Sequence, residues 1–286
     1  MRKFAVVPTL LTLGNGICGF VAIAMASRIM PVEPMTESQR FEIERNFVIA
    51  GWFIIGAMVF DMLDGYVARL SKTASKFGGE LDSLCDAISF GVAPAFLILK
   101  MGPGWERGPL VHQILAGIAA LYMVCTILRL ARFNVDNTPD PAAHKRFRGL
   151  PSPGAAGCIA SLAILRGGFP AKLADYWGAE TLEATRAIVQ QFVEVFTPLG
   201  ALIVALLMVS ILPYPHVTKQ WFRGRRHVWH LIQILFALFI IVLIREFALV
   251  LVFWGYAIGL PIRHLVMKHI LKDPSLAPRL DDGLPR

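Results

Sequence analysis

Four aspartates lie in two pairs that border long apolar runs. Asp61 and Asp64 are three residues apart, and Asp82 and Asp86 are four residues apart. Side chains at these spacings share one face of a helix, so two neighbouring helices would bring four carboxylates together. Ionisable groups at membrane depth cost at least about 2.5–3.5 kcal/mol each, and they are therefore usually paired or functional.

Four carboxylates in one small site need compensating cations, because like charges close together repel one another. Two divalent cations would supply that charge. Oxygen ligands without cysteine or nearby histidine favour Mg²⁺ or Mn²⁺ over zinc. Two such ions suit phosphoryl chemistry, in which they stabilise the attacking and the leaving oxygen. The sequence therefore predicts a magnesium or manganese site among these aspartates.

The elements that must hold these carboxylates are membrane helices. Hydrophobic residues make up 56% of the 286 residues, charged residues 17%, and the mean hydropathy is +0.59. These values lie outside the soluble range. The net charge of +8 would suggest nucleic acid in a soluble protein. Here the basic residues lie between apolar runs, where membrane orientation accounts for them, so no nucleic-acid partner is expected.

Eight segments are apolar over about 17 to 23 residues, the length that spans a bilayer. They lie near 8–29, 47–66, 84–101, 109–131, 152–167, 195–213, 228–244 and 246–262. The fifth is short, and only Arg245 and Glu246 separate the last two, so a stricter window would give six or seven. We expect an all-α polytopic membrane protein with a catalytic core at 1–213, two additional helices at 214–272 and a disordered tail at 273–286.

The charges between the spans indicate the orientation. With the N-terminus in the cytoplasm, the interior segments hold most lysines and arginines, whereas exterior segments carry acidic residues such as Glu37 and Glu183. The positive-inside rule then places both termini and the aspartates in the cytoplasm, and a bacterial inner membrane is the expected location. The first residues also resemble a secretory signal, but the apolar run to Met30 is long enough to span.

Two further patterns concern packing. Apolar residues recur at helical spacing between 182 and 196, which predicts an amphipathic helix on the outer surface that runs into the sixth span. The cysteines fall in or beside apolar segments without CxxC spacing, so we interpret them as small core residues and not as disulfides or zinc ligands. They are Cys18, Cys85, Cys125 and Cys158.

The aspartates belong to a longer pattern with eight fixed positions. It reads Asp61-x2-Asp64-Gly65-x2-Ala68-Arg69-x8-Gly78-x3-Asp82-x3-Asp86. This string is similar to the signature of the CDP-alcohol phosphotransferase family. The resemblance implies a six-helix catalytic core and a cytoplasmic site that holds two metal ions, Mg²⁺ or Mn²⁺, around the diphosphate of a CDP-linked donor. It implies Asp61, Asp64, Asp82 and Asp86 as metal ligands, with Asp86 also the general base.

The resemblance also implies contacts with the donor nucleotide. Gly65 and Ala68 would be small positions that let the nucleotide approach, and Arg69 would be its cation. Gly78 would allow close helix packing or approach of the donor, and Ser75 would hydrogen-bond the nucleotide.

The first span offers one more set of polar side chains. Asn15 lies on the same face as Thr9 and Thr12 and is predicted to contribute to the donor pocket. The alternative for the threonines is a hydrogen bond back to their own helix.

Secondary motifs within roughly the first 165 residues resemble the phosphatidylserine-synthase branch of the family, most clearly at 81–94, 129–134 and 147–153. The branch implies transfer of a phosphatidyl group from CDP-diacylglycerol to L-serine with release of CMP, by a homodimer in contact with membrane lipids. The serine carboxylate needs a cation, for which Arg129, Arg132 and Arg148 are candidates. The alternative for each arginine is that it lies at a helix end and only determines the orientation of the protein in the membrane.

Two alternatives stay open. Glycerol 3-phosphate, an inositol phosphate or another alcohol would need a similar basic pocket, so the arginines do not decide the acceptor. A transporter that uses the carboxylates as a relay is the alternative from a different class.

Overall fold

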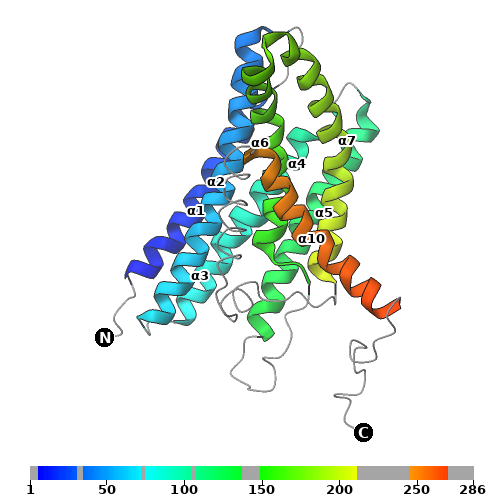
Figure 1. Ribbon diagram of the computed structural model, residues 1–286. Coiled ribbons are helices and arrows are strands. Elements are labelled where there is room, and N and C mark those ends of the chain that lie inside the picture. The colour runs from blue at the N-terminus through cyan, green and yellow to red at the C-terminus, as the bar shows by residue number, and fades with distance from the viewer. Residues whose placement is uncertain are drawn as a thin grey trace, which may run out of the picture.

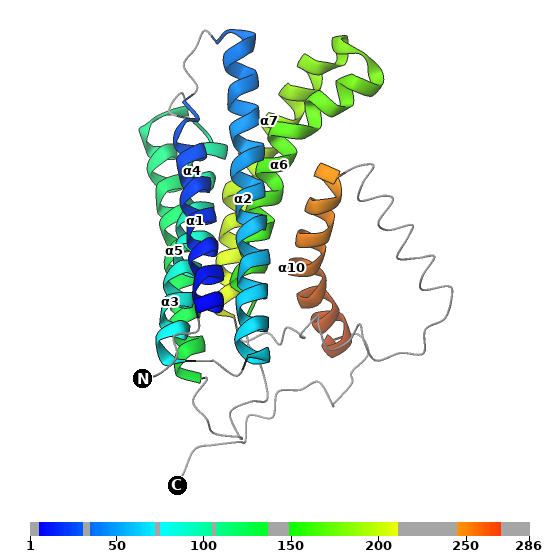
Figure 2. The same cartoon turned by 90° about the vertical axis from the view of Figure 1, so that its left-hand side faces the viewer.

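The computed structural model describes residues 6–30, 35–71, 75–104, 107–136, 149–210 and 245–269, and the regular secondary structure in these ranges is helical. Six helical segments are long and apolar enough to cross a membrane. They are α1 (Val6–Ser27), α2 (Glu37–Leu70), the run α3 (Lys76–Asp86), η1 (Ala87–Val92) and α4 (Ala93–Met101), α5 (Pro109–Asp136), α6 (Ser152–Trp177) and α7 (Leu182–Val209). They form one bundle (Figures 1 and 2), so the predicted all-α membrane class is confirmed.

The outside of the bundle is apolar. Leu10, Ile17 and Phe20 follow one another at helical spacing along α1 and are exposed, as are Leu121 and Leu128 on α5. Contiguous apolar patches are rare on monomers in water. Lipid chains would cover these side chains.

Two helices are longer than their apolar stretches predict. α2 begins at Glu37 because Thr36 and Gln39 form a capping box, in which the Thr36 amide donates to Gln39 Oε1 at 2.9 Å. α6 continues past Pro170 to Trp177. A Cβ at Gly167 would collide with the backbone oxygen of Glu44. This glycine therefore marks a close approach of α6 to α2 and not the end of a helix.

The third span contains a π-helical segment, η1, directly after Asp86. Pro94, in the first turn of α4, has no N–H to donate to the carbonyl four residues earlier. That carbonyl belongs to Phe90, and it accepts the Tyr122 hydroxyl of α5 at 3.2 Å instead. On the other side, the Ser89 hydroxyl donates to the backbone oxygen of Asn15 at 2.9 Å. The wide turn is thus held between α1 and α5.

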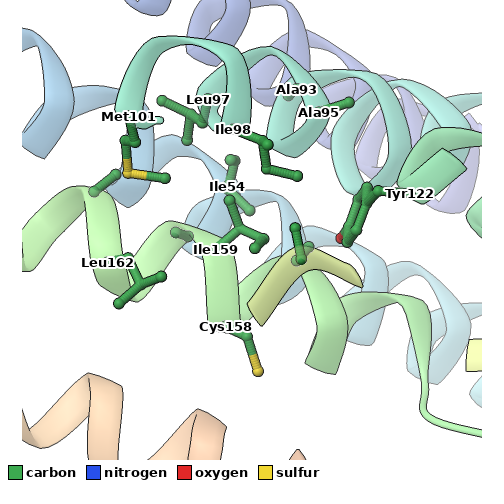
Figure 3. Close-up of a cluster of buried hydrophobic side chains, with 14 of the residues drawn as sticks. Ile54, Ala93, Ala95, Leu97, Ile98, Met101, Tyr122, Cys158, Ile159 and Leu162 are labelled. Atoms are coloured by element: carbon green, nitrogen blue, oxygen red, sulfur yellow. The ribbon is translucent and has the colours of Figure 1, made fainter. Parts of the chain in front are cut away.

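The core between α2, α4 and α6 fixes the middle of the bundle (Figure 3). Ile54, Leu97, Ile98, Ile159 and Leu162 are fully buried there. Burying side chains of this size out of solvent stabilises a fold by about 1.5–3 kcal/mol each, less where lipid is the alternative surrounding. The four cysteines are also buried and free, as predicted.

The predicted amphipathic segment is the first half of α7, which runs without interruption into the sixth span. Val189 and Val193 are buried in the bundle, whereas Ile188 and Phe192 are exposed. One face of the segment therefore packs on the protein. The predicted location on the outer surface is correct only for the other face.

A further helix, α10 (Arg245–His269), overlaps the eighth predicted span. Its apolar part, Glu246–Gly259, is shorter than the six spans. The predicted span at 228–244 and the predicted tail at 273–286 lie outside the described residues, so the division of the chain at 213 stays a prediction.

Candidate active site

All four motif aspartates lie at one end of the bundle, where α1 begins, α2 ends and α3 begins (Figure 1). We call this the aspartate end. Asp61 and Asp64 are in the last turns of α2, and Asp82 and Asp86 are on α3. One carboxylate oxygen from each of Asp61, Asp64 and Asp82 lies within 4.8 Å of the other two. The two helices thus bring Asp61 and Asp64 together with Asp82.

The carboxylates of this cluster are compatible with a divalent metal. Asp64 is only 5% exposed. Asp64 Oδ2 and Asp82 Oδ1 are buried without a hydrogen-bond partner. In the described part of the chain, no lysine or arginine nitrogen forms a salt bridge, within 4.0 Å, with a carboxylate oxygen of any of the four aspartates. Buried carboxylate oxygens without a partner are unfavourable unless a cation binds them.

Asp86 is held differently from the other three. It is 7% exposed, and its Oδ1 accepts a hydrogen bond of 2.8 Å from Asn15 Nδ2. Among the described residues it is not part of the group of three close carboxylates. The amide of Asn15, which the sequence assigns to the donor pocket, therefore orients Asp86, and a direct contact of Asn15 with the nucleotide stays a prediction.

This contact requires α1 to lie directly against α3 and η1. A Cβ at Gly19 would lie 2.7 Å from the Ser89 Cα, and one at Gly16 would lie 3.0 Å from the Cys85 Sγ. Larger residues at Gly19 would push the two helices apart, because the obstacle is backbone. The close approach of α1 is what places Asn15 opposite Asp86.

For Thr12 of the first span, the structure shows the predicted hydrogen bond back to its own helix. The Thr12 hydroxyl donates to the backbone oxygen of Pro8 at 3.0 Å, as expected for a threonine that bonds back to its helix. Thr12 also lies beside the Asp64 carboxylate. It therefore borders the aspartate cluster, and its part in the donor pocket, the other interpretation of the threonines, stays a prediction.

Of the predicted acceptor arginines, Arg129 has an electrostatic interaction with one of the aspartates. Its Nη1 donates to Ser152 Oγ at 2.7 Å, and its guanidinium interacts electrostatically with Asp86. Arg132 is exposed on α5, and Arg148 lies outside the described residues. Two neighbours of Arg129 were missed from the sequence. Ser152 belongs to the 147–153 motif, so the sequence could have indicated it as a site residue. No sequence motif includes Tyr256 of α10.

The predicted nucleotide residues lie around the end of α2 and the start of α3. Arg69 is exposed and Ala68 half-buried. A Cβ at Gly65 would be 3.5 Å from Arg69 Nη1. Ser75 Oγ caps α3 by accepting the Gly78 amide at 3.0 Å. A Cβ at Gly78 would meet only Ser75 in the part of the chain that the structure describes, so no helix packs closely there and approach of the donor remains the prediction.

Comparison with known proteins agrees with this geometry. The family model of CDP-alcohol phosphatidyltransferase matches residues 5–190, and the chain belongs to this family. Its curated relatives include proteins named CDP-diacylglycerol–serine O-phosphatidyltransferase. The one from Helicobacter pylori is 43% identical over 121 residues, which are 42% of this chain and 48% of the relative.

Two more distant relatives carry the same name. The Methanocaldococcus jannaschii protein is 35% identical over 167 residues, 58% of this chain and 63% of the relative. The Saccharomyces cerevisiae protein is 36% identical over 148 residues, 50% of this chain and 48% of the relative. The chain thus spans about half the length of the bacterial and yeast relatives that it matches.

Proposed function

We propose that this protein transfers the phosphatidyl group of CDP-diacylglycerol to the hydroxyl of L-serine and releases CMP. The observation that carries the proposal is the aspartate cluster with its buried, unpaired carboxylate oxygens, next to a separately oriented Asp86. Membership of the CDP-alcohol phosphatidyltransferase family supports the reaction class. The names of relatives in three domains of life support serine as the acceptor.

Asp61, Asp64 and Asp82 would hold the metal, with Asp86 at its edge, and we propose Mg²⁺ or Mn²⁺ because the donor set consists of carboxylate oxygens. When bound, two such ions screen the phosphate oxygens and stabilise both the attacking and the leaving oxygen. Within the described residues, no lysine or arginine forms a salt bridge with these aspartates. Their carboxylates are therefore available to a metal ion.

Asp86 acts as the general base. The serine hydroxyl oxygen forms a bond to the phosphorus that bears diacylglycerol, the bond from that phosphorus to the CMP oxygen breaks, and Asp86 accepts the hydroxyl proton. Asn15 donates to one oxygen of Asp86 and so fixes the direction of the carboxylate. A carboxylate held in this way reacts without first paying for a rotamer change.

Arg129 is the acceptor-side cation. Its guanidinium interacts electrostatically with Asp86, and a guanidinium can bind the serine carboxylate through two parallel hydrogen bonds. Arg132, which is exposed, would act further out, where the substrate enters. Arg148 lies outside the described residues and stays a candidate. We also propose a homodimer in a bacterial inner membrane, with both termini and the aspartate end in the cytoplasm, on the positive-inside distribution of the basic residues.

The reaction is tested with purified protein in detergent, labelled CDP-diacylglycerol and Mn²⁺. Parallel samples contain L-serine, glycerol 3-phosphate, an inositol phosphate or no alcohol. CMP released only with serine supports the proposal. CMP released with a different alcohol keeps the chemistry and changes the acceptor, and no CMP with any alcohol favours a transporter.

The role of Arg129 is tested by comparing L-serine with L-serinamide, which has the hydroxyl but no carboxylate. The Arg129→Gln variant should lose at least tenfold in kcat/KM for serine and little for serinamide, because only serine presents an anion to the missing cation. Arg132→Gln is the matched control on the same helix. Equal losses for both acceptors would remove Arg129 from the serine carboxylate.

A further inference from the structure

Helix α10 lies beyond residues 5–190, the segment that matches the family model, and yet it packs on the core in a fixed register. Figure 1 shows it crossing α6 and α7 obliquely. The Trp254 indole donates to the backbone oxygen of Cys158 at 3.1 Å, and the Cys158 thiol donates to the backbone oxygen of Phe253 at 3.5 Å. In Figure 3 the Cys158 side chain points away from the core between α4 and α6.

Small residues on the core receive the aromatic side chains of α10. A Cβ at Gly157 of α6 would collide with the Phe253 ring, and one at Gly200 of α7 would collide with the Trp254 ring. The Trp254 ring also meets Phe196 edge-on, with 4.7 Å between ring centroids. These contacts leave α10 no freedom to slide by a turn, since each ring fills a space that only glycine provides.

This register places Tyr256 beside the acceptor side of the active site. Its ring carbon Cε1 lies 3.4 Å from the Cβ position of Gly154, two residues after Ser152. Tyr256 interacts electrostatically with Arg129, whose Nη1 is bonded to Ser152 and whose guanidinium also interacts with Asp86. Arg129 is therefore within electrostatic range of both the proposed base and a residue of α10.

We propose that α10 completes the acceptor side of the active site and that Tyr256 is a positioning residue for the Arg129 guanidinium. A guanidinium has five N–H donors and no acceptor, so a phenol oxygen beside it can accept one of them. Ser152 already accepts from Nη1, and a second acceptor at Tyr256 would hold the guanidinium with its remaining N–H groups, including the unpartnered Nε, available to a carboxylate. This inference rests on the proposed function and assigns the recognition of a carboxylate-bearing acceptor to a segment outside the family match.

The test is Tyr256→Phe, which keeps the ring against Gly154 and removes the hydroxyl. We expect the KM for L-serine to rise about fivefold, the loss associated with one hydrogen bond. The KM for CDP-diacylglycerol and the midpoint of thermal unfolding should stay at their wild-type values. Tyr176→Phe is the matched control, since Tyr176 is 70% exposed at the far end of α6.

A double variant separates positioning from packing. In an Arg129→Gln background, Tyr256→Phe should change the serine KM by less than twofold, because the group that it positions is gone. The proposal is overturned if Tyr256→Phe has the wild-type serine KM, if its effect persists in the Arg129→Gln background, or if both substrate KM values rise together with a lower unfolding midpoint.

The wild-type acceptor panel is run first, so that the two proposals fail separately. If the wild-type protein releases CMP with a different anionic alcohol, serine is the wrong acceptor, and the same comparison with that alcohol still tests Tyr256. If it releases CMP with serine and Tyr256→Phe has no effect, the function stands and the role of Tyr256 is wrong.

Discussion

Two clusters of carboxylates lie at opposite ends of α2, and they are compensated in different ways. At the end where α2 begins, Arg186 of α7 binds three glutamates: Nε to Glu44 Oε1 at 2.7 Å, Nη1 to Glu37 Oε2 at 2.8 Å and Nη1 to Glu183 Oε1 at 2.6 Å. At the aspartate end, within the described residues, no lysine or arginine forms a salt bridge with Asp61, Asp64, Asp82 or Asp86.

The difference agrees with the proposed metal site. Arg186 supplies a cation where the carboxylates tie α2 to α7, whereas the described residues supply no salt-bridged cation where the buried oxygens converge. The clusters are far apart, because Glu44 and Asp61 are separated by about 25 Å of helix at about 1.5 Å per residue. A change at one end should therefore leave the other intact.

Removal of metal should have the largest effect. With EDTA, CMP release should stop, and excess Mg²⁺ or Mn²⁺ should restore it, because among the described residues no lysine or arginine forms a salt bridge with Asp61, Asp64 or Asp82. Mn²⁺ electron paramagnetic resonance on the apoprotein should show binding that is lost in Asp61→Asn/Asp64→Asn and kept in Glu37→Gln/Glu44→Gln. Binding lost equally in both double variants would erase the distinction between the clusters.

Asp86→Asn should lower kcat by about 10³, within the range for loss of a general base. The KM for CDP-diacylglycerol and Mn²⁺ binding should change little, because Asp86 lies apart from the three close carboxylates. Rapid-quench assays of CMP release measure the rate, and equilibrium binding of labelled donor measures retention. Wild-type turnover in this variant would show that another group takes the proton.

Asn15→Leu should lower kcat about tenfold. The substitution keeps the approximate volume and removes the donor to Asp86, while the bond from Ser89 to the Asn15 backbone oxygen remains available. The measurement is steady-state CMP release with saturating donor and serine. Unchanged kcat would mean that the hydrogen bond holds the fold of α1 and not the direction of the base.

Arg186→Gln should act on stability and not on activity. It leaves Glu44, whose side chain is 13% exposed, without its partner, and we expect the free energy of unfolding to fall by about 1–3 kcal/mol. Glu183 is 62% exposed, so Glu183→Gln should change it by less than about 0.5 kcal/mol. Chemical denaturation in detergent measures both, and kcat per folded molecule should stay at the wild-type value.

Much of the aspartate end follows from the sequence because it depends on local spacing. Asp61 and Asp64 share a face of one helix, Asp82 and Asp86 share a face of the next, and a short connection makes the two helices neighbours. The family signature adds the metal and the donor. None of this requires knowledge of contacts between distant segments.

The remaining contacts depend on packing that spacing does not encode. Asn15 and Asp86 are 71 positions apart and meet only because glycines of α1 let η1 approach. Tyr256 comes within electrostatic range of Arg129 only because the Trp254 ring fits into the space at Gly200. Hydropathy also misplaced the ends of α2 and α6, since capping at Thr36 and close approach at Gly167 are not apolar signals.

The π-helical segment η1 has a consequence for the length of the chain between Asp86 and α4. Each residue of an α-helix turns the chain by about 100°. A π-helical turn holds about one residue more than an α-helical turn, so deleting one residue from η1 would favour a regular α-helix with both halves of the span still in phase. Deleting one residue from α4 instead would leave an apolar segment long enough to cross a bilayer, but it would rotate the half that carries Asp82 and Asp86 relative to the half that is buried against α6. Outside η1, a substitution should therefore disturb the cluster less than a change in residue number, because hydropathy is insensitive to phase and the cluster is not.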